Sequence, residues 1–237
     1  MGFGSGASGK EKTRRDTATV TTTCNEVVAR LAKIKVPLRA EPIREVRREF
    51  SKRVADWAPD DVVGLALCLL SLAGWPNRLV AYELLTHNPR AMSVLNSATV
   101  QRLGKGIDNW GAVDTFSLYV SGPAWREGQI PDRLINQWVR SSDRWLRRAA
   151  LVSTVALNCK ARGERGDTER TLSVCEKLLG DRDDMVVKAL SWALRELSKR
   201  DPEVVRTFLQ QHESEMASRI IREVGNKLRS GVKNPRH

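Results

Sequence analysis

Three tryptophans in this chain each share a helix face with a charged residue. Side chains three or four positions apart meet on the surface of a helix. Aromatic faces beside arginines suit nucleic acid, and a carboxylate among them could stabilise positive charge on a sugar. The three pairs are Trp110 and Asp114, Trp145 and Arg148, and Trp192 and Arg195. The pattern predicts a nucleic-acid surface that carries one chemically active carboxylate.

The overall charge of the chain points to the same kind of partner. Its 237 residues hold 40 Lys and Arg against 28 Asp and Glu, a net charge of +12. Residues 126–165 alone contain nine basic and four acidic side chains, so the excess is not confined to a terminal tail. Such a balance favours a polyanion, most simply DNA. A basic protein without a nucleic-acid partner stays an alternative.

The sequence contains no residue pattern typical of a metal or cofactor site. The four cysteines form no Cys-x-x-Cys pair, and with only three histidines we expect no metal and no cofactor. Isolated cysteines suit packing in the core of a protein that lies in a reducing compartment. We therefore expect a cytoplasmic protein, which its function would associate with the nucleoid. No apolar run is long enough to span a membrane. The cysteines are Cys24, Cys68, Cys159 and Cys175.

The chain divides by composition into a tail, a helical region and a short end. Residues 1–22 are rich in Gly, Ser and Thr and predict a flexible basic tail, and residues 231–237 a C-terminal tail. Between them, residues 23–230 carry helical periodicity and no sustained alternation, which predicts an all-α domain. The expected helices are 23–34, 42–56, 60–72, 76–87, 91–104, 109–121, 131–141, 143–159, 168–179, 183–200, 202–212 and 215–229.

Helices of this length joined by short loops favour a HEAT-like helical-repeat solenoid. The three tryptophan units lie 35 and 47 residues apart, within the range of helix-pair repeats but irregular. Successive second helices of a solenoid line one concave face. We therefore expect the charged pairs to converge in a concave basic groove.

Three sequence blocks resemble the landmarks of the AlkD-type DNA alkylation repair family. They are NWGAVD (109–114), WLRRAA (145–150) and KALSWALRE (188–196), in the family's order and near its spacing. Residues 74–85, which end in YELL, are similar to an earlier helix pair of that family. The resemblance covers about residues 25–230, and the three blocks together are far more specific than any one alone.

The resemblance implies a HEAT-like DNA glycosylase with defined site residues. Asp114 matches the family's catalytic carboxylate, and Trp110 and Trp192 match the aromatic pair that packs against the deoxyribose of the damaged nucleotide. Arg148 matches a contact to the DNA backbone, and Arg195 lies on the same face as Trp192. Members of the family act on duplex DNA while the damaged base remains stacked.

Further basic residues extend this expected surface. Arg144 lies one turn before Arg148 and would form a cationic strip with it. Lys188 and Lys105 are further candidates for contacts to DNA phosphates. The four tryptophans outside the pairs, together with Trp145, are expected to pack in the interior; the four are Trp57, Trp75, Trp125 and Trp138.

The chemistry follows from the substrate that such a site would suit. A purine alkylated at N3 or N7 carries positive charge and is already a good leaving group, so no general acid is required. Loss of the base develops positive charge on the sugar, which one carboxylate can stabilise while it orients a water. Asp114 between two tryptophans fits this one-carboxylate case. With no lysine in an obvious nucleophile setting, we expect hydrolysis without strand cleavage.

Other interpretations remain open at this point. Asp114 could be a solvated or capping residue, Trp110 and Trp192 could belong to the core, and Arg148 could be a plain surface charge. The chain could also be a helical module that binds DNA structures without cleaving them, or a scaffold for a protein partner. A monomer is the default expectation.

Overall fold

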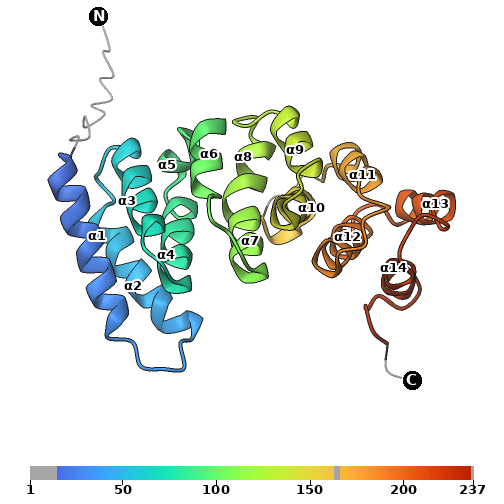
Figure 1. The fold of residues 1–237 in the computed structure, drawn as a ribbon, viewed down its shortest axis with the longest axis horizontal. Coiled ribbons are helices and arrows are strands. Elements are labelled where there is room, and N and C mark those ends of the chain that lie inside the picture. Colours follow the sequence, from blue (N-terminus) through green and yellow to red (C-terminus); the bar gives the residue numbers. More distant parts are fainter. Residues whose placement is uncertain (1–14, 163–165, 236–237) are drawn as a thin grey trace, which may run out of the picture. The chain divides into compact units, whose positions relative to one another are not determined.

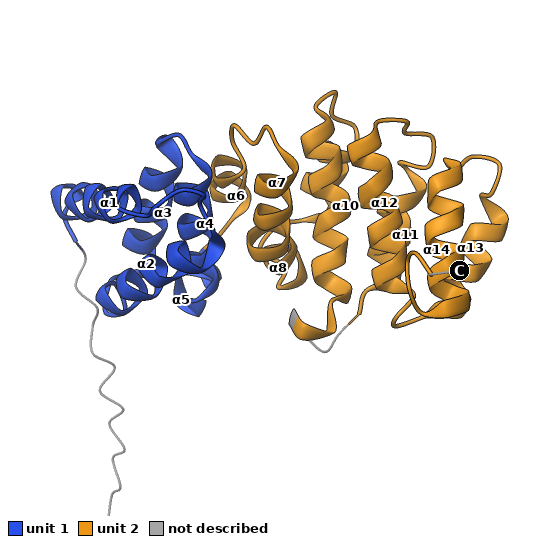
Figure 2. Ribbon diagram, turned by 90° about the horizontal axis from the view of Figure 1, so that it is seen from below, with its two compact units in different colours: residues 1–94 blue, residues 95–237 orange. Residues whose placement is uncertain are grey.

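The computed structural model describes residues 15–162 and 166–235, in which helices joined by turns and loops occur and no β-strand does (Figure 1). The chain forms two compact units, which meet in sequence between Val94 and Leu95 (Figure 2). The single domain expected over residues 23–230 stays a prediction. No helix in the described ranges is long and apolar enough to cross a membrane.

Unit 1 is a packed group of helices. Helix α3 packs against α1 and α4, α2 packs against α4, and α5 lies against both α3 and α4. Its interior includes Phe50, Leu65, Leu69 and Tyr82. The helices are α1 (Thr17–Ala32), α2 (Ala40–Arg53), α3 (Pro59–Ser71), α4 (Trp75–Thr86) and α5 (Pro89–Ser93).

The first helix corrects the expected boundary of the N-terminal tail. Asp16 caps α1 by accepting a hydrogen bond from the backbone N–H of Thr19 at 2.7 Å. The helix therefore begins at Thr17, and Thr23 is already buried. The threonine-rich composition of this stretch resembles a tail, but a good capping residue starts the helix within it. Residues 1–14 lie outside the described part of the chain.

Unit 2 carries its longer helices in a row. Helix α7 packs on α10, α10 on α12 and α12 on α14, with α8, α9 and α11 against α10 and α13 beside α14 (Figure 2). The elements are α6 (Ser97–Leu103), α7 (Trp110–Phe116), the π-helical turn η1 (Ser117–Ser121), α8 (Gly122–Arg126), α9 (Asp132–Val139), α10 (Arg144–Asn158), the 3₁₀ turn η2 (Lys160–Arg162), α11 (Thr168–Glu176), α12 (Asp184–Leu197), α13 (Pro202–Gln211) and α14 (Ser218–Ser230). This stacking within the unit is compatible with a helical repeat, and the HEAT-like solenoid stays a prediction.

Two of the expected helices have different limits in the structure. The stretch 91–104 is interrupted around Leu95, because Asn96 caps a new helix by accepting from the backbone N–H of Thr99. The helix predicted over residues 109–121, in contrast, does not end before Gly122-Pro123. The helix continues through η1 directly into α8, and Pro123 directly follows the π-helical turn, where the i→i−4 hydrogen-bond ladder that a proline interrupts is already altered.

Most of the tryptophans expected in the interior are buried. Trp57, Trp125 and Trp138 are at most 5% exposed, which confirms that prediction. Trp75 is 37% exposed, so its predicted burial is wrong. It is the first residue of α4, directly after Gly74, whose φ of 118° turns the chain into the helix. A side chain in a first turn has fewer neighbours than one further along.

Gly122 lies where α8 approaches α10 most closely, and this gives a test of the packing. A Cβ at Gly122 would lie 2.4 Å from the Cβ of Ala156 and 2.9 Å from the carbonyl oxygen of Ser153. We expect Gly122→Ala to lower the free energy of unfolding by about 1–3 kcal/mol, the usual cost of overpacking. Gly180→Ala is the control, because a Cβ there meets no atom within 4 Å. Equal denaturation midpoints for the two variants would contradict this packing.

Candidate nucleic-acid interface

A cleft of about 500 Å³ in unit 2 brings together most of the residues predicted from the sequence. Trp110 and Asp114 come from α7, Arg148 comes from α10, and a group from α12 completes the wall. The lining residues are Trp110, Asp114, Arg148, Met185, Lys188, Trp192, Arg195 and Lys233. Because α7, α10 and α12 pack in series, side chains on equivalent faces converge in one place, as the spacing of the three blocks predicts.

Side-chain caps fix where each of these three helices begins. Asn109 accepts from the N–H of Ala112 before α7, and Asp143 and Asp183 cap α10 and α12 in the same way. A cap of this kind is worth about 0.5–2 kcal/mol to a helix. The start of α7 at Trp110 leaves that indole 62% exposed at the mouth of the cleft, with Asp114 one turn further in.

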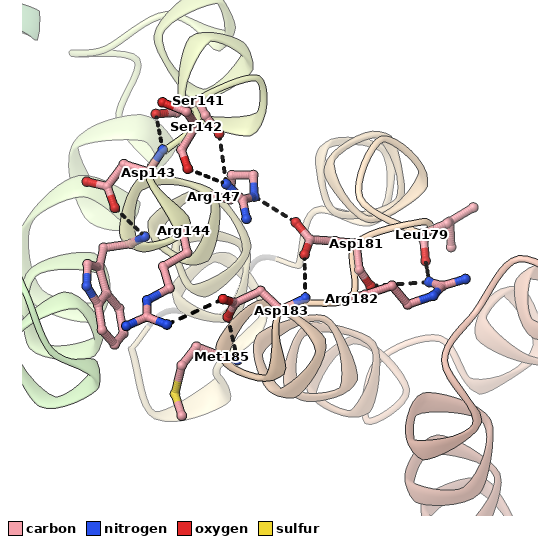
Figure 3. Close-up of polar contacts among 11 residues, drawn as sticks. Ser141, Ser142, Asp143, Arg144, Arg147, Leu179, Asp181, Arg182, Asp183 and Met185 are labelled. Carbon is pink, nitrogen blue, oxygen red and sulfur yellow. Dashed lines mark hydrogen bonds and ion pairs between the residues drawn. The ribbon is translucent and has the colours of Figure 1, made fainter.

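In addition to these caps, hydrogen bonds made by one arginine hold α10 beside α12 (Figure 3). Arg147 donates from Nε to Asp181 at 2.7 Å and from Nη1 to the carbonyl oxygens of Ser141 and Ser142 at 2.9 Å. Asp181 also accepts from the backbone N–H of Asp183, the residue that caps α12. One arginine therefore joins the loop before α10 to the loop before α12, which aligns the beginnings of the two helices.

Arg148 and Asp114 form a two-pronged ion pair in the cleft wall. Arg148 Nε and Nη2 donate to Asp114 Oδ1 and Oδ2, each at 2.8 Å. Its Nη1 donates to the backbone carbonyl of Met185 at 2.5 Å, so all three nitrogens have partners. The Arg148 side chain is 7% exposed and that of Asp114 14%. This geometry favours a role for Arg148 in orienting Asp114 over the predicted contact to a DNA phosphate.

The same surroundings set the proton affinity of the carboxyl group. Burial raises the pKa of Asp114 above its ordinary value of 3.8, while the hydrogen bonds and charge of Arg148 act in the opposite direction. A carboxylate with few water molecules around it interacts strongly with any cation brought next to it. Asp114 therefore fits neither a fully solvated surface carboxylate nor a helix cap.

Helix α12 supplies the aromatic and basic residues of the opposite wall. Trp192 is half-buried, and Lys188, one turn earlier, pairs with Asp184 at 2.6 Å. Arg195 donates from Nε to Ser191 Oγ at 3.2 Å. Burial lowers the pKa of Arg195, against the opposing charges of Glu223 and Glu196. The cleft thus contains the basic side chains of Lys188 and Arg195 together with the ion pair of Asp114 and Arg148.

Two predicted DNA contacts do not line this cleft. The Arg144 guanidinium stacks 4.9 Å from the ring centre of Trp145 and pairs with Asp183 at 3.5 Å. Lys105 lines a separate, largely apolar pocket of about 430 Å³ that also includes Trp145, Phe116 and Trp138. The cationic strip expected from Arg144 and Arg148 therefore does not form, since one side chain is paired at the surface and the other is buried.

Sequence reasoning missed Lys233, which it assigned to a C-terminal tail. Residues up to 235 are described, and the segment after α14 folds back so that Asn226 Nδ2 donates to the Lys233 carbonyl at 3.2 Å. Helical periodicity carries no signal for this contact. The one indication in the sequence is a glycine, Gly231, which is common directly after a helix. In the structure Gly231 has a left-handed conformation, with a φ of 74°, and reverses the chain at the end of α14.

No group of His, Cys, Asp and Glu that could hold a metal ion occurs within residues 15–162 and 166–235. In those same ranges the four cysteines are free thiols, and Cys24 and Cys175 are buried, which suits their expected place in the core.

Residues 19–228 match the model of a protein family described as DNA alkylation repair enzyme. The chain belongs to this family. The match spans both compact units and includes the three blocks that converge in the cleft. No curated protein matches the chain. Membership in the DNA alkylation repair family makes DNA the substrate expected at the cleft and damage by alkylation the setting of its reaction.

The ion pair of this repair enzyme can be tested by titration. Because Arg148 lowers the pKa of Asp114 against the effect of burial, Arg148→Met should raise that pKa further. The measurement is an NMR titration of the Asp114 side-chain carboxyl carbon. Arg144→Met is the matched control on the same helix and should leave the pKa unchanged. A pKa that is the same in parent and Arg148→Met would contradict the pairing.

Proposed function

We propose that this repair enzyme is a monofunctional DNA glycosylase. It hydrolyses the N-glycosidic bond of purines that carry positive charge through alkylation at N3 or N7, such as 3-methyladenine and 7-methylguanine, in duplex DNA. The observation that supports this most is the Asp114 carboxylate, held by Arg148 in a cleft that also contains Trp110 and Trp192.

In this reaction the main contribution of the protein is to stabilise the positive charge that develops on the sugar. The cationic purine leaves with the electrons of the bond between its nitrogen and C1′, so the base becomes neutral and the sugar gains positive charge. The Asp114 carboxylate, with little water around it, stabilises that charge, and it orients a water whose oxygen bonds to C1′. The proton of that water passes to the solvent. Each indole face adds about 0.5–2 kcal/mol of cation–π stabilisation.

The openness of the site supports recognition of a base that remains stacked. Enzymes that extrude a base enclose it in a tight pocket. Here Trp110 is 62% exposed at the mouth of the cleft, and the cleft wall presents side chains suited to a sugar and a backbone. A site that does not enclose the base can also accept bulky adducts at N3 or N7.

The state of the two lysines in the cleft supports hydrolysis without strand cleavage. Lys188 pairs with Asp184 at 2.6 Å and Lys233 pairs with Glu223 at 3.2 Å. A lysine side chain engaged in an ion pair with a carboxylate is a poor nucleophile toward the sugar. Neither lysine is therefore well placed to form the imine through which bifunctional glycosylases cut DNA.

The test is base release from methylated duplex DNA by the parent protein and by Asp114→Asn. We expect the parent to release methylpurines and Asp114→Asn to be slower by at least about a hundredfold, as for the loss of one electrostatic stabiliser. DNA affinity should change little, because the variant retains the cations of the cleft. Glu176→Gln, the same chemical change at an exposed position of α11, should be as active as the parent.

Two results would contradict the proposal. Release by Asp114→Asn at the parent rate would remove the carboxylate from the reaction. No release by the parent from methylated DNA or from DNA with bulky N3 and N7 adducts, despite salt-sensitive binding, would instead indicate a module that binds DNA without cleaving it.

A further inference from the structure

The segment that follows α14 returns to the cleft and contributes a lysine to its wall. Gly231 reverses the chain, with its N–H donating to the carbonyl of Lys227 at 3.0 Å. Asn226 then holds the backbone of Lys233 through a hydrogen bond of 3.2 Å. The family match ends at residue 228, so this lysine lies beyond the part of the chain that the family describes.

Glu223 on α14 fixes the ammonium group of Lys233. Lys233 Nζ lies 3.2 Å from Glu223 Oε1, while Ser191 Oγ donates to Glu223 Oε2 at 2.6 Å. The Glu223 side chain is 6% exposed. Burial opposes its ionisation, but the hydrogen bonds from Ser191 and Lys233 and the charges of Lys233 and Arg195 outweigh burial and lower its pKa. The residue is therefore a buried carboxylate at neutral pH.

This one carboxylate faces two cations, Lys233 and Arg195. The neighbouring acid, Glu196, is engaged by Lys199 at 2.6 Å. Three cations, Lys233, Arg195 and Lys199, therefore face two carboxylates, Glu223 and Glu196, which leaves a local excess of one positive charge. In contrast, Asp114 pairs with one cation, Arg148. An excess cation at the edge of a cleft, half-buried and held in place, attracts an anion more effectively than a mobile surface lysine.

The two cations also have donors to spare. The Lys233 side chain is 40% exposed, and an ammonium has three donors, one of which faces Glu223. Of the three guanidinium nitrogens of Arg195, Nε alone has a hydrogen-bond partner among the described residues, namely Ser191 Oγ. Its two terminal nitrogens can therefore donate to a ligand. A planar guanidinium fork beside an ammonium suits the oxygens of a phosphodiester.

We propose that Lys233 and Arg195 form a phosphate subsite that binds the DNA backbone next to the damaged nucleotide. The subsite rests on the proposed DNA substrate, because it places a phosphate on the strand whose deoxyribose lies at Asp114. Glu223 and Ser191 act as positioning residues that hold both cations toward the cleft. The segment after α14 is thereby part of the DNA-binding surface.

The experiment measures the affinity of the full chain for an unmodified duplex over a range of salt concentrations. The logarithm of the binding constant falls linearly with the logarithm of salt concentration, by about 0.9 per phosphate neutralised. We expect Lys233→Gln to reduce the magnitude of this slope by about 0.9, and Lys233→Arg to restore it. Lys177→Gln is the control, since Lys177 bonds Asn136 and Ser173 on α9 and α11 and does not line the cleft.

A slope for Lys233→Gln equal to that of the parent would overturn the proposal. An equal loss in Lys177→Gln would also overturn it, because the effect would then reflect net charge and no specific contact. Circular dichroism melting checks that each variant is folded. Unmodified DNA is used because its binding does not require catalysis, so a failure of base release and a failure of this subsite are separate outcomes.

A second measurement locates the phosphate. Duplexes carrying an abasic analogue would have single neighbouring phosphates of the same strand replaced by neutral methylphosphonates. At the contacted position, the substitution should weaken binding by the parent and have no further effect on Lys233→Gln, as a double-mutant cycle requires. Equal losses for both proteins at every neighbouring position would place Lys233 away from the damaged nucleotide.

Discussion

The ion pair between Arg148 and Asp114 connects the three helices that form the cleft. Arg148 comes from α10, its carboxylate partner from α7, and the carbonyl of Met185 that it also bonds from α12. Removing one partner of a buried pair leaves the other charge without compensation, which is more costly than never having had the pair. The packing of α7, α10 and α12 and the orientation of the carboxylate therefore depend on each other.

This arrangement suits a reaction in which positive charge appears and then disappears. A carboxylate that is fixed before the substrate arrives needs no reorganisation when charge develops on the sugar. Arg148 opposes the effect of burial on the pKa of Asp114, and its two hydrogen bonds to the carboxyl oxygens favour the ionised form. The indoles of Trp110 and Trp192 extend the site without adding charge. The other cations of the cleft can attract the DNA backbone while Arg148 remains committed to Asp114.

Local signals in the sequence predict much of this structure, and long-range pairing accounts for most of the rest. Capping residues such as Asn109 place the helix starts, and the spacing within the blocks places Asp114 on the helix face that lines the cleft. The family resemblance implied a DNA-backbone contact for Arg148, and helical periodicity could not reveal its pairing with Asp114, a partner 34 residues away. Gly122 suggested a break because close packing and a turn both favour glycine. Lys233 depends on a chain reversal that only the packed structure reveals.

The central claim is that Asp114 stabilises positive charge at the sugar. Its most direct test compares two abasic analogues in otherwise identical duplexes, a neutral tetrahydrofuran and a cationic pyrrolidine that mimics the charged sugar. We predict that the parent binds the cationic analogue at least about a hundredfold more tightly than the neutral one, as expected for a mimic of the transition state. Asp114→Asn should lose this preference. Equal affinity of the parent for the two analogues would contradict the account.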